Sequence, residues 1–138
     1  MASALQSTAV GQEAIASGGA SVALGRGAEA TGLVSTALGA SSNATGTSST
    51  AVGSAAQATG EVSTALGAAS EASGTRSLAV GQGSVASGSQ SSAVGQGSTA
   101  SAAGSVALGA GSIADRDNSV SVGDLGAESI DFLDIVFK

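Results

Sequence analysis

Serine hydroxyls recur along this chain at one fixed spacing, and a hydroxyl acts as a nucleophile when a general base lies beside it. Nine serines lie exactly fourteen residues apart, at 7, 21, 35, 49, 63, 77, 91, 105 and 119. The commonest base for a serine is histidine, and the chain contains none. Its few carboxylates are scattered over different repeats. We therefore predict no catalytic residues and no enzyme activity.

Three aspartates near the C-terminal end, Asp115, Asp117 and Asp124, are the candidates for calcium binding. Their spacing lacks the glycine and the distal glutamate of an EF-hand loop, and no segment matches the calcium-binding nonapeptide of other β-rolls. Gly25-Arg26-Gly27 and Gly81-Gln82-Gly83 begin like nucleotide-binding loops, but neither has the third glycine. We predict no metal and no cofactor.

The composition excludes several other classes of protein. A net charge of −6 argues against nucleic acid as a partner, because such binding needs clustered Lys and Arg. The chain is 42% hydrophobic but only 1% aromatic, and it has no cysteine for a disulfide. No apolar run reaches the ~20 residues of a membrane span, and Met1 is not followed by a secretory leader. We expect a soluble segment that lacks the large side chains of an ordinary globular core.

The fourteen-residue spacing of the serines belongs to a complete repeat, S-x-A-[VL]-G-x-x-[AS]-x-A-[ST]-G-x-x, whose places we number 1 to 14 from each serine. Position 4 is Val or Leu in every copy. Position 5 is always glycine: Gly11, Gly25, Gly39, Gly53, Gly67, Gly81, Gly95, Gly109 and Gly123. A disordered low-complexity chain would not keep this order through more than a hundred residues.

The spacing of the small and apolar positions predicts strands. A coiled coil needs apolar residues alternately three and four apart, whereas the regular places here are 2, 4, 8 and 10. We predict two strands per repeat, at positions 1–4 and 8–11, with the glycines of positions 5 and 12 in turns that need positive φ or close backbone approach. Parallel stacking would place coils ~4.8 Å apart, and nine coils would form a rod of ~43 Å.

The same alternation predicts which side chains face inward. We expect positions 2, 4, 8 and 10 to point into the coil, and the Ser and Ala of positions 1 and 3 to point outward. Nine copies would then form a flat, uncharged Ser/Ala stripe, and such a β face favours association. We predict an oligomer with this stripe at the subunit interface.

The phrase Ser-Val-Ala-Leu-Gly followed by Ala-x-Ala-[ST]-Gly resembles the head repeats of YadA-like trimeric autotransporter adhesins. The resemblance implies an all-β, left-handed parallel β-roll of 14-residue two-strand repeats that forms a homotrimer. It further implies a virulence-associated head on a fibre at a Gram-negative cell surface, binding host extracellular matrix proteins such as collagen, fibronectin or laminin. The phrase associated with collagen binding in this family maps onto Ser21, Val22, Ala23, Leu24 and Gly25, and onto Ser105, Val106, Ala107, Leu108 and Gly109.

We divide the chain into head repeats, residues 1–123, and a C-terminal tail, residues 124–138. The tail lacks the neck motif of the family, and it is interpreted as a cap, a neck-like element or a non-native end. Outer-membrane anchoring would depend on parts of a parent chain that are missing here.

Two other functions remain open. The repeats could form a structural spacer in a surface or phage fibre. They could also bind ice, because Thr8, Thr36, Thr50 and Thr64 share position 2. Ice binding is disfavoured because other residues interrupt this row and because position 2 is expected to face inward.

Overall fold

The computed structural model describes residues 1–123, which form a straight stack of two-strand coils. The first strand of each coil joins a nine-stranded sheet. Its strands are β1 (Thr8–Val10), β3 (Val22–Leu24), β5 (Thr36–Leu38), β7 (Thr50–Val52), β9 (Thr64–Leu66), β11 (Leu78–Val80), β13 (Ser92–Val94), β15 (Val106–Leu108) and β17 (Val120–Val122).

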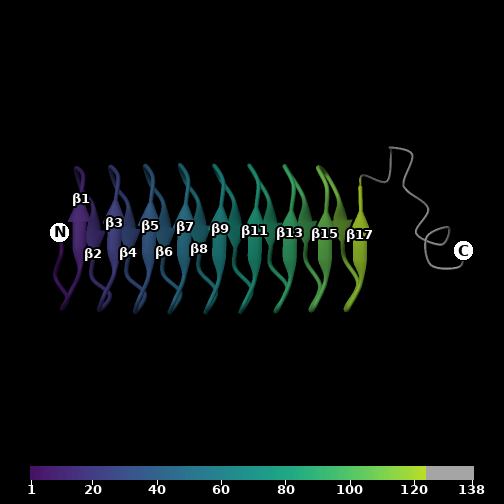
Figure 1. The fold of residues 1–138 in the computed structure, drawn as a ribbon, viewed down its shortest axis with the longest axis horizontal. Coiled ribbons are helices and arrows are strands. Elements are labelled where there is room, and N and C mark those ends of the chain that lie inside the picture. Colours follow the sequence, from purple (N-terminus) through teal and green to yellow (C-terminus); the bar gives the residue numbers. More distant parts are fainter. Residues whose placement is uncertain (124–138) are drawn as a thin grey trace, which may run out of the picture.

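The second strand of each coil joins an eight-stranded sheet on the other side of the coil. Its strands are β2 (Ile15–Ala16), β4 (Glu29–Ala30), β6 (Asn43–Ala44), β8 (Gln57–Ala58), β10 (Glu71–Ala72), β12 (Val85–Ala86), β14 (Thr99–Ala100) and β16 (Ile113–Ala114). Every pairing is parallel and joins residues fourteen apart, such as Ala37 with Ala51. The coils therefore follow one another from β1 to β17 along the long axis (Figure 1). This confirms the predicted all-β parallel solenoid, although the strands are shorter than expected and occupy positions 2–4 and 9–10.

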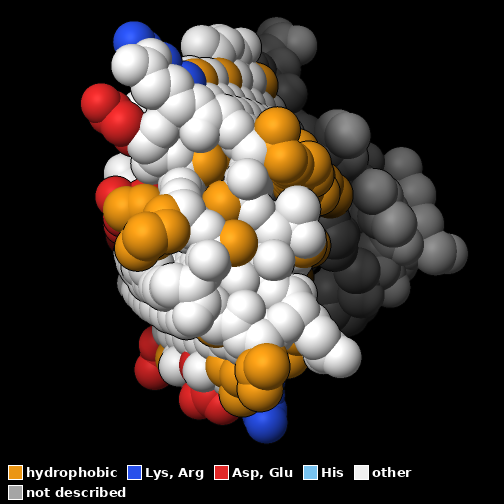
Figure 2. Space-filling model, turned by 90° about the vertical axis from the view of Figure 1, so that its left-hand side faces the viewer, with side chains coloured by type: hydrophobic (Ala, Val, Ile, Leu, Met, Phe, Trp, Pro, Cys, Tyr) orange, Lys and Arg blue, Asp and Glu red, His pale blue; other side chains and the backbone are white. Residues whose placement is uncertain are grey.

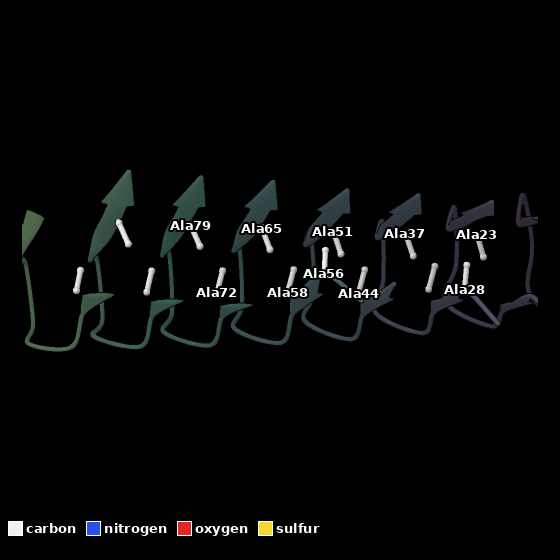
Figure 3. Close-up of a cluster of buried hydrophobic side chains, with 14 of the residues drawn as sticks. Ala23, Ala28, Ala37, Ala44, Ala51, Ala56, Ala58, Ala65, Ala72 and Ala79 are labelled. Carbon is white, nitrogen blue, oxygen red and sulfur yellow. The ribbon is translucent and has the colours of Figure 1, made fainter. Parts of the chain in front are cut away.

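The interior of the coil contains only alanine and serine side chains. Position 3 of the first strand and positions 8 and 10 of the second bring two rows of side chains toward each other, and Ala51, Ala56 and Ala58 are fully buried (Figure 3). Serines at position 8, such as Ser84, donate their hydroxyl to the carbonyl of the preceding glycine, here Gly81, at 2.8 Å. The two sheets are therefore close enough that only small side chains fit between them.

The predicted orientation of the first strand was wrong. Positions 1 and 3 face inward, as Ser35 and Ala37 show with no exposed surface, while Thr36 and Leu38 at positions 2 and 4 are partly exposed. The prediction assumed that Val and Leu, as the more hydrophobic residues, would fill the core. A coil this thin has no space for them, so the smaller Ser and Ala take the inside. The prediction for positions 8 and 10 of the second strand was correct.

Each coil turns through two four-residue turns, at positions 5–8 and from position 12 to the next position 1. In the first coil their hydrogen bonds run from Ala14 N–H to Gly11 carbonyl and from Ser21 N–H to Gly18 carbonyl, both at 3.2 Å. The third residue of each turn has a left-handed φ between 54° and 68°, as a type II turn requires at that place. These residues, at positions 7 and 14, include Glu13, Ala20 and Gly27, and their varied types gave no sign of this conformation in the sequence.

The glycines of positions 5 and 12 confirm both predicted reasons for glycine. At position 5, φ is positive at every one of the nine glycines, as at Gly39 with 132°. At position 12, a methyl group added to Gly46 would lie far inside van der Waals contact with the carbonyl oxygen of Gly60 in the next coil. Position 5 therefore needs glycine for its conformation as well as for space. At position 12 the six glycines from Gly18 to Gly88 are needed for space, whereas the last two coils have Ala102 and Arg116 there.

Val62 is a β-branched residue at a left-handed turn position, with φ of 56° and half of its side chain exposed. The left-handed region costs an L-residue about 1–2 kcal/mol, and asparagine tolerates it better than valine. We expect Val62→Asn to raise the free energy of unfolding by about 1 kcal/mol, measured by denaturant unfolding. Thr47→Asn, at an exposed turn residue outside the left-handed region, is the control and should give no gain. Equal effects of the two substitutions would contradict the assignment of strain to Val62.

Candidate functional site

The two Ser-Val-Ala-Leu-Gly segments lie on strands β3 and β15 of the nine-stranded sheet. In the first segment Ser21 and Ala23 are fully buried, whereas Val22 is partly exposed and Leu24 is exposed. The second segment repeats this pattern: Ser105 and Ala107 are buried, Val106 is partly exposed, Leu108 is exposed, and Gly109 makes the turn. The phrase therefore offers only apolar side chains to a partner, and its polar side chain belongs to the interior.

The outward side chains of the nine-stranded sheet form a continuous surface that we call the apolar stripe. It consists of positions 2 and 4: Thr8, Val10, Val22, Leu24, Thr36, Leu38, Thr50, Val52, Thr64, Leu66, Leu78, Val80, Ser92, Val94, Val106, Leu108, Val120 and Val122. Val10 is 58% exposed and Leu108 is 46% exposed. Within residues 1–123 the stripe contains no charged residue. Figure 2 shows hydrophobic side chains stacked one behind another along one side of the molecule, while red and blue side chains gather elsewhere.

The stripe replaces the predicted Ser/Ala stripe as the face that favours association. An uncharged, flat and largely aliphatic strip that runs the length of the described coils is typical of a protein interface. The threonines of position 2 belong to it, so the expectation that they face inward was also wrong. Their row is still interrupted by Val22 and Leu78, so it is not a continuous threonine ladder.

The opposite, eight-stranded sheet presents a different surface, which we call the polar face. Its outward side chains come from positions 9 and 11: Ile15, Ser17, Glu29, Thr31, Asn43, Thr45, Gln57, Thr59, Glu71, Ser73, Val85, Ser87, Thr99, Ser101, Ile113 and Asp115. Glu29, Asn43, Gln57 and Glu71 are direct neighbours on successive strands. Position 11 adds a parallel row of exposed hydroxyls, as at Thr45 and Thr59. The middle of this face thus carries hydrogen-bonding groups and the ends carry isoleucine.

The polar face was not predictable from repeated residues, because position 9 is occupied differently in almost every coil. The useful signal was this variation between two neighbouring positions that are always small. Position 9 lies between the buried Ala or Ser of position 8 and the buried alanine of position 10, so its side chain is free to vary.

The aspartates and glycine segments considered as binding candidates lie at the surface and in turns. Asp115 and Asp117 are exposed, and residues 1–123 contain no cluster of three potential metal ligands. Asp124 and the rest of the tail lie outside the described residues. The glycines of Gly25-Arg26-Gly27 lie in a turn between strands, with no helix after it. The part of the chain that the structure describes holds no helix of the length and apolarity needed to cross a membrane.

The fold and the two long faces define a repeat solenoid with two extended surfaces. A family model for the YadA head domain repeat, two copies per model, matches residues 2–28, 30–56, 44–70, 58–84, 72–98, 86–112 and 100–124. The chain therefore belongs to the family of YadA head repeats, and its fold is that of an adhesin head domain.

Among solved structures, the chain is similar to the collagen-binding domain of the Yersinia adhesin YadA. The two share 35% sequence identity and a TM-score of 0.69, over 91% of this chain and 70% of that one. No curated protein sequence matches the chain. The family resemblance drawn from the repeated phrases is thus confirmed by both the repeats and the structure.

Proposed function

We propose that this chain is the head of a cell-surface adhesin that attaches bacteria to host extracellular matrix, with proteins of the collagen class as ligands. The observation that carries the proposal is the likeness to the collagen-binding domain of YadA, at 35% identity over most of this chain. In this proposal the head is exposed on a fibre that other segments of a parent chain anchor in an outer membrane.

We further propose that three chains associate through their apolar stripes, each chain running as a left-handed coil. The supporting observation is the absence of charge on this face throughout residues 1–123, together with exposed aliphatic side chains such as Leu24 and Leu66. Burial of such a strip removes apolar surface from water, at about 25 cal/mol for each Å². Association also covers alanine-rich coils that have no large core of their own.

An arrangement of this kind leaves the polar face exposed to a ligand. Its amide and hydroxyl groups recur on successive strands ~4.8 Å apart, so an extended polypeptide lying along the stack would meet similar groups on several rungs. Each contact is weak, but repetition along the coil and among three chains raises the overall affinity. We therefore place ligand binding on the polar face.

The proposal is tested by solid-phase binding of the chain, first shown to be trimeric by sedimentation, to collagen, fibronectin and laminin. We expect binding to at least one of them, and a several-fold loss of affinity in Thr45→Lys/Thr59→Lys, which blocks the centre of the polar face. The control is Ser54→Lys/Ala68→Lys, which adds the same charge to exposed turn residues on two successive coils and should bind as before.

No binding to any of the three matrix proteins by a verified trimer would contradict matrix adhesion and favour a structural spacer. Equal losses in the two double variants would contradict the polar face as the binding surface. Thermal hysteresis of the same preparation would instead indicate ice binding.

A further inference from the structure

The polar face carries charge of one sign. Within residues 1–123 its outward side chains include three carboxylates, Glu29, Glu71 and Asp115, and no lysine or arginine. The three arginines of this part of the chain lie in the turns between strands. The amino group of Met1 lies at the N-terminal end of the sheet, where it donates to the Ala14 carbonyl. The face is therefore complementary to a partner that carries positive charge.

The three carboxylates differ in their distance from the arginines of the turns. Asp115 is followed directly in the sequence by Arg116, so this carboxylate has a cation beside it. Arg26 precedes Glu29 by three residues, at an exposed turn position that does not belong to the face. Glu71 has no arginine in its own coil before it. Glu29 and Glu71 are therefore the carboxylates of this face that a cationic partner would meet.

The spacing of these two glutamates defines what they can bind. Both occupy position 9, and Asn43 and Gln57 lie between them on directly paired strands. Three strand spacings of ~4.8 Å separate the two positions by ~14 Å. A single metal ion cannot join carboxylates so far apart, because a bound Ca²⁺ lies about 2.3–2.6 Å from its oxygen ligands. The pair fits two separate cationic groups.

The residues between the two glutamates favour a polypeptide as the carrier of these groups. The Oδ1 of Asn43 is buried and has no hydrogen-bond partner among residues 1–123. A buried acceptor of this kind is stabilised when a donor reaches it, and a bound backbone offers N–H donors along its length. Gln57 is exposed on the next strand, and Thr45 and Thr59 expose hydroxyls beside it. The centre of the face thus offers polar contacts to a chain that lies along the stack.

We propose that the ligand of the polar face is an extended polypeptide segment with two basic side chains four residues apart, one paired with Glu29 and the other with Glu71. This inference rests on the proposed function, which places ligand binding on this face. An extended chain covers ~3.3–3.6 Å for each residue, so four residues span ~13–14 Å and match the two glutamates. Each exposed ion pair is weak, so selectivity comes from forming both pairs at once.

Dense peptide surfaces test this proposal without any matrix protein. The full chain is passed over immobilised Gly/Ser peptides that carry two lysines four residues apart, two adjacent lysines, or two glutamines in place of the lysines. At low ionic strength we expect retention on the spaced lysines to be several-fold stronger than on the adjacent lysines, with no retention on the glutamines. Salt at about 1 M should abolish the retention, because it screens exposed charges beyond ~3 Å.

Substitutions of the two glutamates test the assignment of residues. Glu29→Gln/Glu71→Gln should weaken retention on the spaced lysines several-fold. The matched control is Glu13→Gln/Glu61→Gln, which removes the same charge from exposed turn residues and should bind as before. Glu29→Lys/Glu71→Lys should lose the spaced-lysine peptide and gain a peptide with two glutamates at the same spacing. Circular dichroism of each variant establishes that the solenoid is intact.

Equal retention on spaced and adjacent lysines, no retention on the spaced lysines, or equal effects of the two glutamine variants would overturn this inference. Binding of Glu29→Gln/Glu71→Gln to a matrix protein with the strength of the original chain would also overturn it, while leaving matrix adhesion intact. Retention on the spaced lysines by a chain that binds no matrix protein would support the inference and contradict matrix adhesion alone.

Discussion

Gly46→Ala is expected to abolish cooperative folding of the solenoid or to reduce its free energy of unfolding by at least about 3 kcal/mol, the upper range for overpacking a well-packed interior. The added methyl group would collide with the carbonyl of Gly60, a backbone atom that cannot rotate away as a side chain can. Relief requires the two coils to separate, which would break the hydrogen bonds between them. Thermal unfolding followed by circular dichroism measures the effect.

Gly97→Ala is the control for this prediction. Gly97 has a φ of 65°, and an added methyl group would meet nothing within 4 Å. Ala55 and Ala69 already occupy the same repeat position with φ of 57° and 54°. The expected loss is therefore no more than the about 1–2 kcal/mol of the left-handed conformation. A loss for Gly46→Ala no greater than that of Gly97→Ala would show that the coils move apart easily.

Val52→Asp/Val80→Asp is expected to convert a trimer of the chain into monomers. The two side chains lie on β7 and β11 within the apolar stripe, and no charged residue accompanies them on this face in residues 1–123. In a trimer joined through the stripe, six added carboxylates would lie close together in an apolar interface, and burial of unpaired charge is strongly unfavourable. Sedimentation should show a mass falling from three times 12.6 kDa to 12.6 kDa.

The matched control is Thr45→Asp/Ser73→Asp, which adds the same two charges, also two coils apart, to the polar face. We expect it to keep the trimer. Dissociation by the control alone, or a trimer that survives the changes in the stripe, would place the interface elsewhere on the molecule.

The solenoid was predictable from the sequence because the fourteen-residue repeat shows the length of one coil and the positions of its turns. Two positions with glycine and regular alanines between them exclude a helix and fix the number of strands in each coil. The conformational role of Gly39 and the steric role of Gly46 both follow from residue type, since only glycine lacks the Cβ that would collide or restrict φ.

The orientation of the first strand was not predictable by the usual rule that hydrophobic residues face inward. Leu38 is more hydrophobic than Ser35, yet Ser35 is buried and Leu38 is partly exposed. The deciding quantity is the distance between the two sheets, which is a property of the closed coil and of no single repeat position. The polar face was not predicted because its outward side chains at position 9 differ from coil to coil, so they do not form a repeating motif.

The near identity of successive coils also means that their interior contacts do not distinguish one coil from another. Ala51 would pack as well beneath Ala23 as beneath Ala37, so the order of the coils is set by the connectivity of the chain and by its unlike ends. One feature that distinguishes the last coil from the others is a side-chain contact: Asp117 accepts a hydrogen bond from the Ala103 N–H at 3.0 Å. A gene encoding such a chain can lose or duplicate a unit of fourteen residues and still encode a closed solenoid, so the length of the head is open to change by recombination while its cross-section stays constant.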